Sequence, residues 1–121
     1  MKENKKHGIG LQYALNGIKE AFNRERNFRI HLVVAAIVII ASFILRLSAT
    51  EWMFILLAIY IVLVAELMNS IAERIIDHIK PEIHMNAKII KDIGAAIVLI
   101  AVIFSVIIGL IVFLPKLTIL L

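Results

Sequence analysis

The sequence predicts an all-α integral membrane protein, in which an N-terminal amphipathic surface helix precedes three transmembrane helices. Hydrophobic residues make up 62% of the 121 residues, whereas soluble domains average roughly 45–50%. These residues gather in three long segments, and basic residues gather on one side of them. A chain of this length forms one domain, so we expect residues 1–121 to be a single membrane domain.

The three apolar segments are expected to form transmembrane helices at about residues 29–48, 52–79 and 88–114. Each is long enough for the ~20 residues that a helix needs to cross a bilayer core. The backbone must satisfy its own hydrogen bonds in lipid, so these segments are helices and not open strands. We expect Pro81 to end the second helix and Pro115 to follow the end of the third, leaving a short tail.

Residues 9–24 have the pattern of an amphipathic helix. Leu11, Leu15, Ile18 and Phe22 recur at spacings of three and four, with polar and basic residues between them. Such a helix is expected to lie on the membrane surface. A water-exposed linker helix is the alternative.

The basic residues predict the orientation of the chain. Seven of the thirteen lysines and arginines precede the first apolar segment, and four lie between the second and third. The positive-inside rule therefore places the N-terminus and the second connection in the cytoplasm, with the C-terminus outside. The basic arm fits an anionic lipid surface better than a nucleic acid. The absence of cysteine excludes disulfides and thiolate chemistry.

Four polar residues share one face of the second apolar helix: Glu66, Asn69, Glu73 and Asp77, at steps of three, four and four. An ionisable side chain in such a helix costs about 2.5–3.5 kcal/mol, so it indicates a functional site. At ~1.5 Å per residue from Trp52, Glu66 lies about 21 Å and Glu73 about 31 Å from the outer interface. We expect Glu66 in the inner leaflet and Glu73 at the cytoplasmic boundary.

Charged residues of the other segments flank the same boundary. Glu25 precedes the first apolar segment, and Lys88, Lys91 and Asp92 precede the third. Carboxylates from two helices can hold a divalent ion and lysines can bind ATP phosphates, which is most of what phosphoryl transfer requires. A polar stripe that only holds helices together is the alternative. The four histidines lack metal-site spacing and are expected to be solvated or interfacial.

These motifs resemble the small prokaryotic diacylglycerol kinase family. Residues 66–77 carry the pattern E-x-x-N-S-x-x-E-x-x-x-D, and residues 91–96 read K-D-I-G-A-A. Residues 25–28, which read E-R-N-F, and His31 look most like the Gram-positive undecaprenol kinase branch. Ile90 departs from the small residue usual before Lys-Asp in the family, which leaves the charged positions intact.

The resemblance implies a homotrimer in a bacterial cell membrane that transfers a phosphoryl group from ATP, with Mg²⁺, to a lipid hydroxyl. It implies that Glu66 is the catalytic base and that Asn69 supports the site. The positions implied to bind ATP and the metal are Tyr13, Lys19, Glu25, Glu73, Asp77, Lys91 and Asp92. Among these, Glu25 and Glu73 are implied to be metal ligands, while Lys91 meets the phosphates and Asp92 steadies it.

The sequence therefore predicts a lipid kinase that converts undecaprenol to undecaprenyl phosphate. Its partners are expected to be the lipid substrate, ATP and the membrane, with no nucleic acid. A diacylglycerol kinase that makes phosphatidic acid is the alternative on the same scaffold. An alternative of another class is a small proton-coupled transporter, in which Glu66 binds protons. A non-catalytic subunit is a further alternative.

Overall fold

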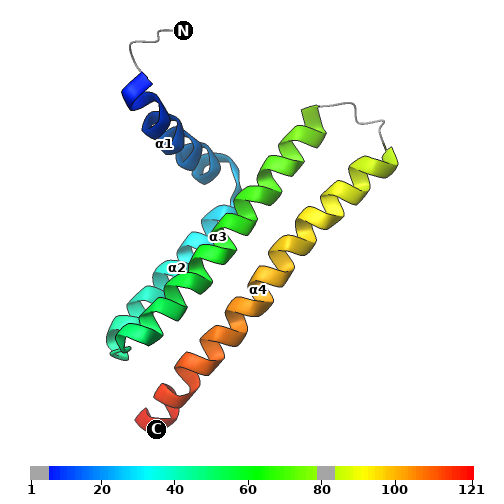
Figure 1. Cartoon of the computed structure of the whole chain (residues 1–121). Coiled ribbons are helices and arrows are strands. Elements are labelled where there is room, and N and C mark those ends of the chain that lie inside the picture. Colours follow the sequence, from blue (N-terminus) through cyan, green and yellow to red (C-terminus); the bar gives the residue numbers. More distant parts are fainter. Residues whose placement is uncertain (1–5, 79–83) are drawn as a thin grey trace.

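The computed structural model describes residues 6–78 and 84–121, and these residues form four helices. They are α1 (Lys6–Arg24), α2 (Arg26–Ile44), α3 (Ala49–His78) and α4 (His84–Leu120). In Figure 1, α3 and α4 run along each other as long rods, α2 follows α3, and α1 diverges from the bundle. Helix α3 contacts both α2 and α4, so it is the central element. The predicted all-α fold is confirmed.

Three helices are long and apolar enough to cross a membrane: Arg26–Ile44, Ala49–His78 and Asn86–Leu120. Their large apolar side chains are mostly exposed, including Val33, Phe54, Phe104 and Ile111. Exposed apolar surface of this extent is the mark of a membrane contact and not of a soluble domain. The protein is therefore a multi-pass membrane protein, as the sequence predicts. Pro81, expected to end the second span, lies outside the described residues.

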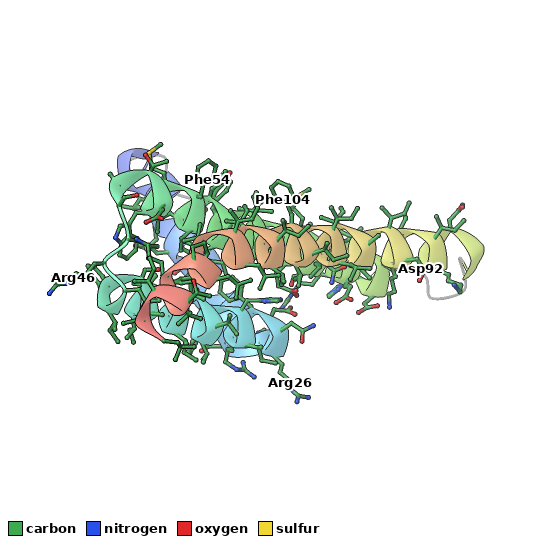
Figure 2. The ribbon with its side chains drawn as sticks, turned by 90° about the horizontal axis from the view of Figure 1, so that it is seen from below. Arg26, Arg46, Phe54, Asp92 and Phe104 are labelled. Atoms are coloured by element: carbon green, nitrogen blue, oxygen red, sulfur yellow. The ribbon has the colours of Figure 1, made fainter. Side chains whose placement is uncertain are left out.

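A helix C-cap and an N-cap together make the tight turn from α2 to α3. The Leu47 amide donates to the Ser42 carbonyl and the Arg46 amide to the Phe43 carbonyl, both at 3.2 Å. This is a Schellman motif, and Arg46 takes the left-handed conformation it requires, with φ of 55°. Figure 2 shows Arg46 pointing away from the bundle.

The start of α3 is fixed by a capping box. The Ser48 amide donates to Glu51 Oε1 at 2.8 Å, and the Glu51 amide donates to Ser48 Oγ at 3.2 Å. Two amides at the helix start are thereby satisfied without water.

The expectation that Pro115 follows the end of the last helix is wrong, because α4 continues through it to Leu120. Proline removes the backbone donor for the Ile111 carbonyl, four residues earlier, and transmembrane helices tolerate such a proline. The Thr118 hydroxyl donates to the Pro115 carbonyl at 2.9 Å. Lys116 Nζ also lies 3.0 Å from Glu51 Oε1, which ties the last turns of α4 to the start of α3.

The core lies between α3, α4 and the α2–α3 turn. Its buried apolar residues are Leu47, Ile55, Ala58, Ile108 and Val112. The Ser105 hydroxyl donates to the Ala58 carbonyl at 3.0 Å, across the two helices. Such interhelical bonds average about 0.6 kcal/mol in a membrane protein. Close packing therefore provides most of the free energy that holds α4 against α3.

The corner between α1 and α2 is held by Arg29. Its guanidinium donates to the carbonyls of Phe22 at 2.7 Å and Asn23 at 3.2 Å, which are orphan groups at the end of α1. The apolar residues of α1 expected to face the membrane, including Leu11 and Ile18, are exposed. The structure therefore leaves the apolar side of α1 uncovered.

Truncating the core at Ile55, which is 2% exposed, should destabilise the fold. We expect Ile55→Ala to lower the free energy of unfolding by about 2–4 kcal/mol, through lost contacts and a residual cavity. Denaturant titration in detergent, followed by circular dichroism, measures this. Ile119→Ala, at a residue 82% exposed, is the matched control and should change stability by less than about 0.5 kcal/mol. Equal losses would show that the α3–α4 core does not hold the fold.

Candidate active site

The polar face of α3 runs from the interior of the bundle to the end of the helix. Glu66 is 3% exposed, and Asn69 and Ser70 are also buried, whereas Glu73 and Asp77 are exposed. A buried carboxylate on a membrane helix is expensive and is seldom kept without a function. The sequence-predicted series thus begins at a buried carboxylate and ends in accessible ones.

Glu66 has a partner on the neighbouring helix. His31 Nε2, from the second turn of α2, lies 3.6 Å from Glu66 Oε1. This distance is too long for a direct hydrogen bond but within ion-pair range when the imidazole is protonated. The charges of Glu73 and Glu25 also act on Glu66. Glu66 is therefore paired with one imidazole of α2 and lies within electrostatic range of two further carboxylates.

Sequence reasoning missed the contact of His31 with Glu66, and the His31 side chain is partly buried. It lines an apolar cavity of about 390 Å³ between α2, α3 and α4. The available signal was a histidine inside an apolar run, a short distance after Glu25.

Asn69 lies against α4 and contacts Glu73, the next carboxylate on α3. Its Nδ2 lies 3.5 Å from Glu73 Oε2, at the limit of a hydrogen bond. Its Oδ1 faces Gly94 of α4 so closely that a Cβ at that position would collide with it. No hydrogen-bond partner for this oxygen is found among the described residues. Gly94 therefore allows α4 to approach α3 closely at this point.

Glu25 connects the α1–α2 corner to α3. It is the N-cap residue of α2, yet its side chain makes no capping hydrogen bond. Its Oε2 instead lies 3.8 Å from Arg74 Nε. Glu25, Ser70 and Arg74 line a cavity of about 310 Å³ between α1 and α3. Ser70 and Arg74 were not singled out from the sequence, although both lie within the 66–77 motif.

The charged start of α4 pairs differently from the expectation. Lys91 Nζ lies 3.0 Å from Asp77 Oδ1 of α3, while Lys88 Nζ donates to Asp92 Oδ2 at 2.6 Å. Consecutive residues on a helix point in different directions, whereas residues four apart face each other. Asp77 therefore steadies Lys91, and Asp92 contacts Lys88 instead. Figure 2 shows Asp92 near the start of α4, at the opposite end of the bundle from Arg46.

Tyr13 and Lys19 both lie on α1 and are exposed. Neither lines the cavity between α1 and α3. Their expected place beside a nucleotide stays a prediction.

Glu25 and Glu73 would be the residues to hold a metal ion that is shared with a nucleotide. Within residues 6–78 and 84–121, no group of three or more side chains is arranged to hold a metal ion. Mg²⁺, however, is usually held by one or two carboxylates together with substrate phosphates and water. Glu25 and Glu73, which both act electrostatically on Glu66, supply carboxylate oxygens of the kind that Mg²⁺ prefers.

Comparison with known proteins agrees with the motif and the fold. The family model of prokaryotic diacylglycerol kinase matches residues 12–113. The undecaprenol kinase of Bacillus subtilis is 42% identical over 105 residues, covering 87% of this chain and 85% of that protein. The diacylglycerol kinase of Synechocystis is 37% identical over 110 residues, which cover 90% of this chain and 63% of that protein. The diacylglycerol kinase of Haemophilus influenzae is 36% identical over 90 residues, which cover 74% of this chain and 76% of that protein.

The spans, the polar face of α3 and the match over most of the chain lead to one assignment. This protein belongs to the prokaryotic diacylglycerol kinase family and is a membrane lipid kinase.

Proposed function

We propose that this protein phosphorylates undecaprenol with ATP, giving undecaprenyl phosphate and ADP. The observation that carries the proposal is Glu66, a carboxylate buried on a membrane helix with a histidine beside it and two further carboxylates in electrostatic reach. Undecaprenol is favoured over diacylglycerol because the B. subtilis undecaprenol kinase is 42% identical to this chain.

In the proposed topology, the N-terminus and the α3–α4 connection lie in the cytoplasm and the C-terminus outside. The clustering of basic residues supports this orientation. Helix α1 then lies on the cytoplasmic surface, where lipid covers its exposed apolar side. ATP reaches the exposed Glu73 and Asp77 from the cytosol, and the lipid hydroxyl reaches Glu66 from the bilayer.

The apolar cavity between α2, α3 and α4 supports a hydrocarbon substrate. Side chains such as Val34, Val62 and Phe113 line it, and His31 lies beside both the cavity and Glu66. A lipid chain in this cavity would bring its hydroxyl to the carboxylate without exposing it to bulk water.

In the proposed reaction, Glu66 takes the proton of the lipid hydroxyl. The hydroxyl oxygen attacks the γ-phosphorus of ATP at the same time. The bond from that phosphorus to the bridging oxygen breaks, and ADP leaves. Glu25 and Glu73 would hold Mg²⁺, which neutralises phosphate charge when bound. Asn69 orients Glu73.

The nucleotide side of the proposal assigns Lys91, held by Asp77, to the phosphates. Asp92, paired with Lys88, is proposed to keep that charged surface in place. Tyr13 and Lys19 of α1 are proposed to contact the nucleotide. A homotrimer with sites between subunits belongs to the same proposal, and light scattering of the purified protein in detergent measures it.

A diacylglycerol kinase is the second candidate, because the Synechocystis and H. influenzae relatives carry that name. The proton-coupled transporter considered from the sequence is overturned by membership of a kinase family.

A competition assay tests the choice of lipid. ATP labelled on its γ-phosphate is offered with equal amounts of undecaprenol and diacylglycerol in detergent micelles, and the products are separated by chromatography. We expect at least about tenfold preference for undecaprenol, equivalent to about 1.4 kcal/mol. Preference for diacylglycerol would reverse the substrate assignment, and label on neither lipid would contradict the kinase proposal.

Glu66→Gln should abolish most turnover while keeping the shape of the side chain. We expect kcat to fall by about 10²–10⁴-fold, the usual contribution of a general base. Glu51→Gln is the matched control, because Glu51 lies at the other end of α3 in the capping box. Its kcat should stay within about twofold of wild type. An active Glu66→Gln variant would remove Glu66 from the mechanism.

Gly94→Ala should damage the site without removing any charged group, because the new Cβ collides with Asn69 Oδ1. Displacing a supporting residue by about 1 Å can cost 10²-fold in rate, so we expect kcat to fall by about 10–100-fold. Gly10→Ala is the control, since a Cβ there meets open space. Equal activity of the two variants would show that close approach of α4 to Asn69 is not needed.

A further inference from the structure

We propose that His31 relays the proton that Glu66 takes from the lipid hydroxyl, delivering it from the buried carboxyl toward the aqueous interface. This inference rests on the proposed function and goes beyond it, by assigning a route for the proton after phosphoryl transfer. His31 acts through Glu66, by accepting its proton and passing it on. It does not contact the reacting phosphorus.

Each turnover leaves a proton on Glu66, which must lose it before the next lipid can react. The Glu66 side chain is only 4% exposed, so direct transfer to bulk water is obstructed. The His31 side chain is 21% exposed and its Nε2 lies 3.6 Å from the carboxylate. The imidazole is therefore adjacent to the carboxyl and less buried than it.

The groups around Glu66 leave His31 as the suitable acceptor. Glu73 on α3 and Glu25 at the start of α2 are the other charged groups that act on it. Both are proposed to hold the metal ion, so neither is free to carry a proton in each cycle. Within the described residues, His31 is the nitrogen base within ion-pair distance of Glu66.

Imidazole chemistry fits the transfer. The proton moves from the Glu66 carboxyl oxygen to Nε2, which restores the carboxylate and gives an imidazolium. The second nitrogen, Nδ1, then releases its proton to water, which leaves the neutral ring protonated on Nε2. A ring flip, or loss of the Nε2 proton with reprotonation of Nδ1, restores the starting tautomer before the next cycle. The 3.6 Å separation requires a small rotation of either side chain or one bridging water.

The position of His31 also argues for a role. It lies five residues after Arg26, the first residue of α2, so it is about 7.5 Å along the helix from its start. Ile30, Val34 and Ala35 of the same helix line the apolar cavity with it. A polar ring in such surroundings is costly unless it has a partner, and its charged partner here is Glu66.

Chemical rescue tests the relay. We expect His31→Ala to lower kcat for lipid phosphorylation by about 10–100-fold, while KM for ATP changes by less than about twofold. Added imidazole should restore kcat in a saturable manner, because it can occupy the vacated space and carry the proton. His78→Ala is the matched control, since His78 is exposed at the end of α3. It should keep wild-type kcat and show no response to imidazole.

His31→Gln distinguishes the proton relay from a purely structural contact. It also replaces His31→Ala as the test if the alanine variant folds poorly. Glutamine can hydrogen-bond to Glu66 but cannot carry a proton, so we expect kcat to fall as in His31→Ala. Wild-type activity of His31→Gln, or an alanine variant that folds yet gains nothing from imidazole, would overturn the relay. If wild type labels lipid and Glu66→Gln does not, such a result removes the relay alone. A wild-type protein that labels no lipid removes the proposed function and the relay together.

Discussion

The burial of one carboxylate within a membrane helix constrains much of this structure. Glu66 cannot be left isolated in lipid, so each neighbouring element brings something to it or to the residues beside it. Helix α2 brings His31, the α1–α2 corner brings the charge of Glu25, and α4 approaches Asn69 at Gly94. The packing near the site is thus set by the need to accommodate polar groups in an apolar solvent.

Stability and chemistry occupy opposite halves of the α3–α4 pair. One half holds the apolar core, the Ser105–Ala58 hydrogen bond and the contact of Lys116 with Glu51. The other half holds buried polar atoms of Asn69 and Ser70 for which the described residues supply no partner. Unsatisfied buried groups are costly. The fold can bear this cost because the other half of the pair is well packed.

The sequence predicts what happens within one helix far better than what happens between helices. The spacing from Glu66 to Asp77 reveals a single polar face, because helical periodicity is a local property. The His31–Glu66 contact could not be predicted, since no period relates residues on different helices. Asp77 rather than Asp92 holds Lys91 for the same reason. The boundary of α4 was predicted wrongly because the helix continues past Pro115, where Lys116 contacts Glu51 at the start of α3.

The two candidate lipids share a hydroxyl but differ in what surrounds it. Diacylglycerol carries two ester groups beside the hydroxyl, whereas undecaprenol carries only hydrocarbon. Selection can therefore draw on polar contacts near the hydroxyl and on apolar contacts, such as those of the cavity between α2, α3 and α4. A single methylene in an apolar pocket is worth only about 1–3 kcal/mol. Modest changes in lining residues can therefore separate an undecaprenol kinase from a diacylglycerol kinase on one scaffold, which is consistent with relatives of both names resembling this chain.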